Sequence, residues 1–157
     1  MSEHRVLVVH NRYRVAGGEE RAVELQLAAL ERAGVPHSAL IRDSAEAGAA
    51  RAARSMLRGG ERPEEVASAV EALGATVVHV HNMHPLFGHR SFEAARSAGA
   101  QVVLHLHNYR LFCAIGIAFR FGEDCFRCRG RRTLPGLVLN CRGSVAESAV
   151  YTTALAL

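Results

Sequence analysis

Residues 76–82 read TVVHVHN, a short β-branched apolar run that is closed by His81 and Asn82. Two other segments have the same form, RVLVVHN at 5–11 and QVVLHLHN at 101–108. Short apolar runs of this kind, bounded by polar residues, are typical of buried β-strands. The repeated pattern therefore predicts strands that all end in a histidine and an asparagine.

Helical segments alternate with these runs. HSALIR at 37–42 reads as a further strand, and the segment 19–34 has the apolar spacing of a helix with Gly34 as its stop. The segment 63–74 begins with proline and ends in glycine, as helices do, and Ser91 is positioned to cap a short helix at 91–99. Alternating strands and helices of this length predict an α/β fold with a Rossmann-like parallel sheet flanked by helices.

The composition fits a folded protein of one domain. Of the 157 residues, 49% are hydrophobic and 22% charged, which excludes a largely disordered chain. The net charge of +4 comes from arginine alone, since the sequence contains no lysine, and arginine suits anionic partners such as a nucleotide diphosphate or an acidic lipid surface. The N-terminus lacks the pattern of a secretory leader, so we expect a cytoplasmic location, with peripheral contact at the inner membrane face as a further option.

Three His-Asn pairs follow predicted strands: His10-Asn11, His81-Asn82 and His107-Asn108. The carboxyl ends of parallel strands share one edge of a sheet, and ligands bind in the crevice above that edge. Histidine and asparagine offer donors and acceptors without an obligatory charge, which suits hydroxyl-rich ligands. The alternative is that these side chains only satisfy backbone groups at the strand ends.

Gly17 and Gly18 lie between the first strand and the first helix. Glycines there allow a ligand to approach the backbone, and the helix start offers N–H groups to an anion. The spacing matches neither a dinucleotide fingerprint nor a phosphate-binding P-loop, and Glu19 and Glu20 would oppose a bare phosphate. A flexible turn into the helix is the alternative.

The segments VLVVHNRYRVAGGEER (6–21), VVHVHNMHPLF (77–87) and VVLHLHNYRLFC (102–113) together resemble the N-terminal domain of family 4 glycosyltransferases of the GT-B type. The resemblance implies that 1–157 is the acceptor-side domain of a two-domain enzyme whose C-terminal, donor-binding domain is absent. It implies retaining transfer of a sugar from a nucleotide-sugar donor to a hydroxyl acceptor, with the isolated chain inactive.

The same resemblance implies roles for individual residues. His107 would hydrogen-bond the transferring sugar as the catalytic residue, and Gly17 and Gly18 would lie close to the donor diphosphate and the acceptor. The remaining residues of the same wall would be Asn11, His81, Asn82, Asn108 and Arg110.

The segment 109–141 has no clear periodicity and carries all four cysteines: Cys113, Cys125, Cys128 and Cys141. The central pair has the C-x2-C spacing with which two thiolates bind one ion, so we expect a structural zinc site and no catalytic metal. Free thiols, disulfides formed on oxidation and an iron–sulfur cluster are the alternatives. After this segment, Ser144 and Glu147 form a capping box that predicts a last helix.

Two other functions compete with sugar transfer. The basic run RCRGRR at 127–132, next to a four-cysteine knuckle, is compatible with a zinc module that binds nucleic acid. Only 6% of the residues are aromatic, and the His-Asn pairs would go unexplained, so nucleic acid is the less favoured partner. A non-catalytic sugar- or lipid-binding relative is the third hypothesis.

Overall fold

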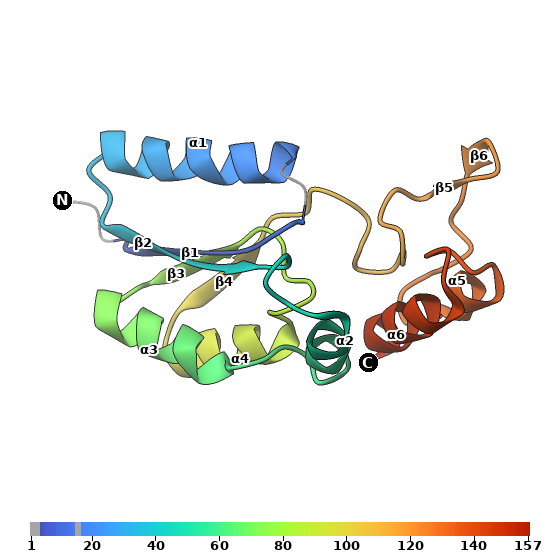
Figure 1. Cartoon of the computed structure of the whole chain (residues 1–157). Helices are drawn as coiled ribbons and strands as arrows, with labels where there is room; N and C mark the ends of the chain where they lie inside the picture. Colours follow the sequence, from blue (N-terminus) through green and yellow to red (C-terminus); the bar gives the residue numbers. More distant parts are fainter. Residues whose placement is uncertain (1–3, 15–16) are drawn as a thin grey trace.

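The computed structural model describes residues 4–14 and 17–157 and shows an α/β fold. Four parallel strands form one sheet in the order β2–β1–β3–β4 (Figure 1). They are β1 (Val6–Arg12), β2 (His37–Asp43), β3 (Val77–Val80) and β4 (Gln101–Leu104). The predicted parallel sheet flanked by helices is confirmed.

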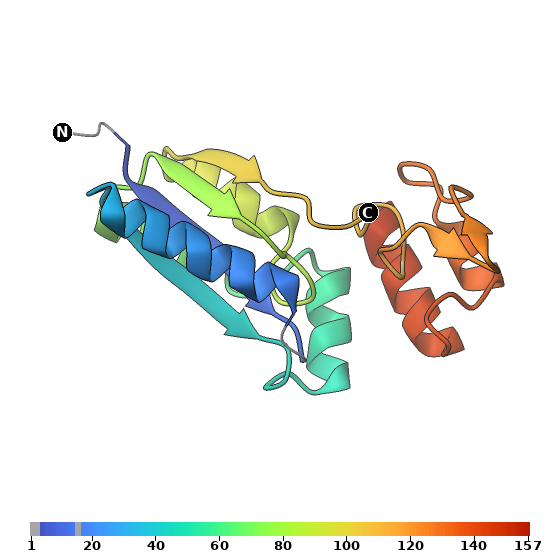
Figure 2. The ribbon, with the colours of Figure 1, turned by 90° about the horizontal axis from the view of Figure 1, so that it is seen from above.

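Helices cover both faces of the sheet. Helix α1 (Gly18–Arg32) lies on one face, while α3 (Pro63–Leu73) and α4 (His89–Ser97) lie on the other (Figures 1 and 2). Side chains alternate between the two faces of a strand, so β1 contributes to both cores. Its Leu7 and Val9 pack with Val66, Val70 and Phe87 beneath α3 and α4, and its Val6 and Val8 pack with Val23 of α1.

The start of α4 differs from the prediction. The helix begins at His89 after Gly88, and Ser91 lies inside it rather than capping it. A Cβ on Gly88 would lie 2.5 Å from the carbonyl carbon of Gly59, so two backbone segments meet where no side chain fits. That close approach sets the helix start two residues before the serine. The last predicted strand is also shorter, because β4 ends at Leu104, before His105 and His107.

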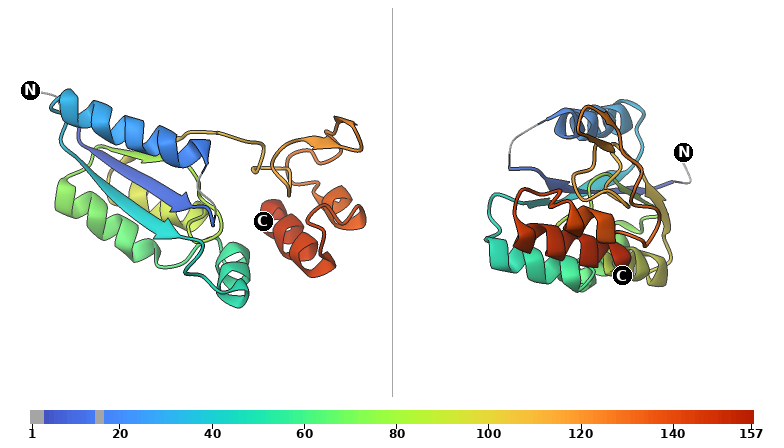
Figure 3. Two further views of the ribbon diagram at one scale, coloured as in Figure 1. Left: turned by 45° about the horizontal axis from the view of Figure 1, so that its top comes forward. Right: turned by 90° about the vertical axis from the view of Figure 1, so that its right-hand side faces the viewer.

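Beyond the carboxyl ends of the strands, α2 (Ala49–Leu57) packs against α6 (Val145–Ala156) (Figures 1 and 3). The hydroxyl of Ser144 accepts a hydrogen bond from the N–H of Glu147 at 3.4 Å, which confirms Ser144 as the cap of this last helix. The Glu147 carboxylate contacts Arg142 at 3.4 Å, so the second half of the predicted capping box is not confirmed.

The segment between β4 and α6 has little regular structure. It contains the antiparallel pair β5 (Phe119–Arg120) and β6 (Glu123–Asp124) and a short helix, α5 (Leu134–Val138), which packs on α6. In Figure 2 this segment and α6 lie to one side of the sheet, past its carboxyl edge.

Across residues 4–14 and 17–157, the structure contains no helix with the length and apolar character needed to cross a membrane.

Candidate functional site

The strand order places a topological switch point at β1. The chain leaves β1 toward β2 on one side and later returns to add β3 on the other side, so a crevice opens above the carboxyl ends of β1 and β3. A cleft of about 350 Å³ lies at this edge, and we call it the carboxyl-edge cleft. The segment after each of the four strands contributes to its lining, with Tyr13, Ser44, His84 and Arg110, and residues of α2 and α6 complete the lining.

The side chains of Asn11 and Asn82 form hydrogen bonds that link the segments after β1, β2 and β3. The Asn11 amide donates to the hydroxyl of Ser44, and its oxygen accepts from the N–H of Leu86 at 3.3 Å. The Asn82 amide donates to the Asn11 carbonyl at 2.8 Å, and its oxygen accepts from the N–H of His84 at 3.1 Å. Both side chains are buried, so these amides match the structural alternative considered for the His-Asn pairs.

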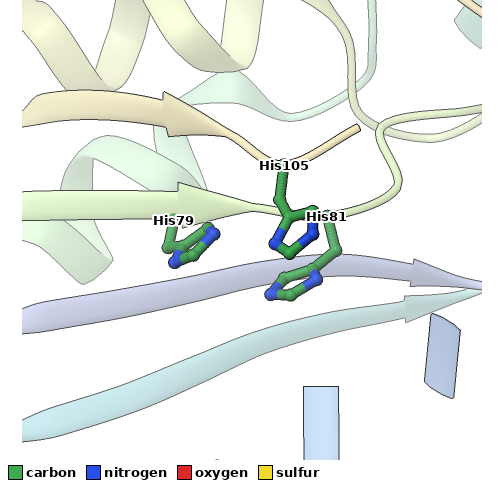
Figure 4. Close-up of side chains that lie close together, drawn as sticks. All are labelled: His79, His81 and His105. Carbon is green, nitrogen blue, oxygen red and sulfur yellow. The ribbon is translucent and has the colours of Figure 1, made fainter. Parts of the chain in front are cut away.

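Four histidines form a stacked row on the sheet face that carries α1. His79 and His81 come from β3 and its end, and His105 and His107 follow β4; Figure 4 shows the first three. Ring centroids are 4.8 Å apart for His79 and His81, 5.1 Å for His81 and His107, and 4.2 Å for His105 and His107. Two of the four, His79 and His105, were missed as site residues, although the alternation VHVH and LHLH places all four on one face.

A hydrogen-bond chain runs along this histidine row to α1. His107 Nε2 lies 2.8 Å from His81 Nδ1, His81 Nε2 contacts the side-chain oxygen of Gln26, and the Gln26 amide nitrogen contacts His79 Nδ1. The Gln26 oxygen accepts from His81 Nε2, so His81 Nδ1 is free to accept from His107 Nε2, and the Gln26 nitrogen donates to His79 Nδ1. All of these hydrogen bonds form when each ring carries a single proton on nitrogen. Burial lowers the pKa of His81 to about 3, so this ring is neutral at physiological pH.

In the described part of the chain, His79, His81 and His105 form a group whose ligand atoms lie within 4.8 Å of one another. Their rings stack with interplanar angles of 16° to 25°, so the in-plane lone pairs run side by side instead of converging on one point. Gln26 already bonds one nitrogen on each of His79 and His81. We therefore interpret the row as a hydrogen-bonded element that orients His107.

His10 faces the start of α1 from inside the protein. Its Nε2 lies 3.6 Å from Glu20, whose carboxylate accepts from the N–H of Tyr13 at 3.0 Å and of Gly17 at 2.7 Å. Burial lowers the pKa of His10. Burial would raise the pKa of Glu20, but the two backbone N–H groups hold it below its usual range. The Gly17 N–H is therefore occupied by a carboxylate, while Gly18 borders open space.

Asn108 joins the end of β4 to the start of α1. Its amide donates to Glu19 at 2.7 Å and lies 3.2 Å from the hydroxyl of Tyr13, and that hydroxyl donates to Glu19 at 3.0 Å. The Asn108 oxygen accepts from the N–H of Arg110 at 2.9 Å, and the Arg110 guanidinium stands 5.0 Å over the Tyr13 ring. Burial raises the pKa of Tyr13 to about 12, so its hydroxyl remains a donor.

The predicted residues therefore divide into two groups. A small pocket of about 20 Å³ beside the carboxyl-edge cleft is lined in part by His81, Asn82, His107, Asn108 and Arg110, and Arg110 also lines the cleft. His10 and Asn11 are buried and do not line this pocket, and the ring centroids of His10 and His81 are 6.3 Å apart.

All four cysteines are half-buried free thiols that line one small cavity of about 20 Å³. Burial raises the pKa of Cys128 and of Cys141, and the other cysteines act in the same direction. Among the described residues, the cysteines do not form a group that is placed to hold a metal ion. The zinc site stays a prediction.

Comparisons with known proteins leave the family open. No family model, no curated protein and no solved structure matches this chain.

Proposed function

We propose that this chain is the acceptor-side half of a retaining glycosyltransferase that moves a sugar from a nucleotide-sugar donor to a hydroxyl acceptor. One observation carries the proposal: the segments after all four strands line a single cleft at the sheet edge where α/β folds bind ligands. The sequence resemblance described above agrees with this location.

In this proposal His107 and Arg110 meet the sugar hydroxyls, and Asn108, whose amide donates to Glu19 and Tyr13, lines the same wall. The Nε2 of His107 is hydrogen-bonded to His81, and its Nδ1 has no hydrogen-bond partner among the described residues. The histidine row fixes the plane of that ring, and orientation of this kind is a large part of transfer catalysis. Arg110 stacks on Tyr13, so its guanidinium is held at the rim.

The start of α1 bears on where the donor binds. Glu20 occupies the Gly17 N–H and is ionised, so a bare diphosphate would meet negative charge there. We propose that Gly17 and Gly18 face the donor only when a second domain supplies the cationic groups. The isolated chain should then bind a nucleotide sugar weakly and transfer nothing.

The test is a two-dimensional amide NMR titration of the chain with methyl glycosides and, separately, with UDP-glucose and GDP-mannose. We expect the glycosides to shift the amides of His107, Asn108 and Arg110, and Asn108→Ala to remove those shifts. Arg21→Gln is the matched control, because Arg21 is exposed on α1 and pairs only with Glu24 in the described residues. Micromolar binding of either nucleotide sugar to this chain, or shifts confined to another face, would contradict the proposal.

We further propose that the four cysteines hold a structural zinc ion, as a four-cysteine segment attached to the domain. The segment has a small apolar core: Ala114 and Ala118 are buried, whereas Phe119, Phe121, Phe126, Leu134 and Val138 are exposed. A closed tetrahedral thiolate site contributes on the order of 10 kcal/mol or more to folding at neutral pH, which would offset that deficit. Elemental analysis should find about one zinc per chain, and a disulfide-linked or metal-free protein would refute the site.

Nucleic-acid binding remains a second candidate because of one surface. Arg127, Arg129, Arg131 and Arg132 are all exposed, and the exposed ring of Phe126 lies in the same segment. Exposed arginines with an aromatic side chain can contact phosphates and stack on bases. Filter binding to single-stranded RNA and DNA at two salt concentrations decides: strongly salt-dependent retention supports this candidate, and no retention removes it.

A further inference from the structure

The lining of the carboxyl-edge cleft combines apolar residues with arginines. The apolar residues are mainly small and aliphatic and come from α2, α6 and the loop after β3: Ala49, Ala52, Ala53, Met56, Pro85 and Val150. The arginines are Arg14, Arg110 and Arg142. Glu147 is the one carboxylate in the lining, so the lining carries a net charge of +2 from three arginines and one glutamate. A neutral sugar alone would not need this charge.

Two of the arginines are held by aromatic rings. Arg142 stands 4.2 Å over the ring of Tyr151, and Arg110 stands 5.0 Å over the ring of Tyr13. Stacking fixes the plane of a guanidinium and leaves its edge donors available for an oxyanion. Arg142 also lies 3.4 Å from Glu147, but its Nε is buried and has no partner in the described residues.

The first turn of α2 adds a third source of positive potential. Ala49 and Ala52 of this turn line the cleft, and the cap residue Gly48 has no side chain with which to satisfy the free N–H groups. The turn contains no acidic residue. A helix of nine residues with an open N-terminus favours a bound anion, and here the arginines point to the same ligand charge.

We infer that the carboxyl-edge cleft binds a phosphate ester that carries an apolar portion, with Arg110 and Arg142 on the phosphate and the α2–α6 walls on the apolar part. This deepens the proposed function, on which it rests for the role of the ligand as acceptor. Forked donors from separate segments suit a tetrahedral group with several oxygens better than a single hydroxyl. A volume of about 350 Å³ lies in the range of small-molecule sites.

The experiment titrates the chain with hexyl phosphate, inorganic phosphate and hexyl β-glucoside, followed by amide NMR and by tyrosine fluorescence, since Tyr13 and Tyr151 line the cleft. We expect hexyl phosphate to bind most tightly. Arg110→Gln and Arg142→Gln should each weaken it about tenfold or more, because each removes a charge-assisted contact. Ala53→Phe should weaken the binding of hexyl phosphate by narrowing the cleft at α2, and Arg21→Gln should leave binding unchanged.

Vesicles of phosphatidylcholine with and without phosphatidic acid identify the source of the phosphate. Retention on phosphatidic acid that Arg142→Gln abolishes assigns a lipid headgroup, and hexyl phosphate binding without vesicle retention assigns a soluble ester; both support the inference. Hexyl β-glucoside binding as tightly as hexyl phosphate, or equal binding by the Arg110→Gln and Arg142→Gln variants, overturns it. If methyl glycosides shift the His107 amide but hexyl phosphate does not bind, this inference alone is rejected. If hexyl phosphate binds but methyl glycosides cause no shift at His107, only the sugar-transfer proposal is rejected.

Discussion

Acidification should destabilise this protein through two buried histidines at the candidate site. His81 and His84 have exposed fractions of 5% and 7%, and burial lowers the pKa of His81 to about 3 and of His84 to about 4. An unfolded histidine titrates near 6.5. Between these values the unfolded chain binds protons that the folded chain does not, so stability is full above pH 6.5 and falls as the pH drops.

The size of the loss follows from these values. Lowering the pH from 7 to 5 protonates each histidine in the unfolded state, which removes about 2 kcal/mol per residue and about 4 kcal/mol for the pair. Burial also lowers the pKa of His10 and His79, so their contributions have the same sign. A loss of this size is a large share of the stability of about 5–15 kcal/mol that small domains have.

Urea unfolding followed by circular dichroism at pH 7 and pH 5 measures the effect. The quantity to compare is the difference between the two free energies of unfolding, so that a general change in stability cancels. His81→Gln and His84→Gln should each reduce that difference by about 2 kcal/mol, and Arg21→Gln should leave it as in the parent protein. If both histidine variants keep the full pH dependence, burial of His81 and His84 is not its source.

Three further predictions concern single side chains. Arg42 is 6% exposed and donates to three backbone carbonyls and a carboxylate, so Arg42→Met should lower the free energy of unfolding by about 3–5 kcal/mol, measured with urea. The control Arg51→Met removes an exposed ion pair and should lower it by less than about 1 kcal/mol. Asn108→Ala leaves Glu19 and the Tyr13 hydroxyl without their shared donor and should cost about 1–2 kcal/mol by the same assay. Cys128→Ser should lower the zinc content from about one per chain to less than half, measured by elemental analysis.

The layered fold was predictable because its signals are local. The apolar runs at 5–11, 76–82 and 101–108 each contain all or most of a parallel strand, and helices lie between them as their periodicity predicted. The start of α4 was not predictable in the same way. It depends on the contact between Gly88 and Gly59, which are far apart in the sequence.

The site was predictable only in part. Strand ends identify which residues reach the carboxyl edge, so His81, His107 and Asn108 were found, and the three His-Asn pairs do lie near one another. The sequence pattern does not reveal which asparagine side chains are already hydrogen-bonded within the protein. Asn11 is fully buried and hydrogen-bonded, so it is not available to a ligand. Gln26 and Tyr13 carry no motif, and their roles come from contacts with residues more than fifty and ninety positions away.

The cysteine segment and the carboxyl-edge cleft are physically linked through α6. The hydroxyl of Thr133 donates to the carbonyl of Thr152, and Arg131 donates to that of Ala156. A Cβ on Gly136 would lie 2.8 Å from the Thr152 methyl group, so α5 and α6 are in close contact beside Cys128. Residues of α6 line the cleft, and the Arg142–Tyr151 stack lies there. The segment proposed to hold the zinc therefore also supports the part of the cleft that we propose binds the phosphate. Loss of the metal in Cys128→Ser should therefore weaken hexyl phosphate binding while leaving the sheet and the histidine row in place.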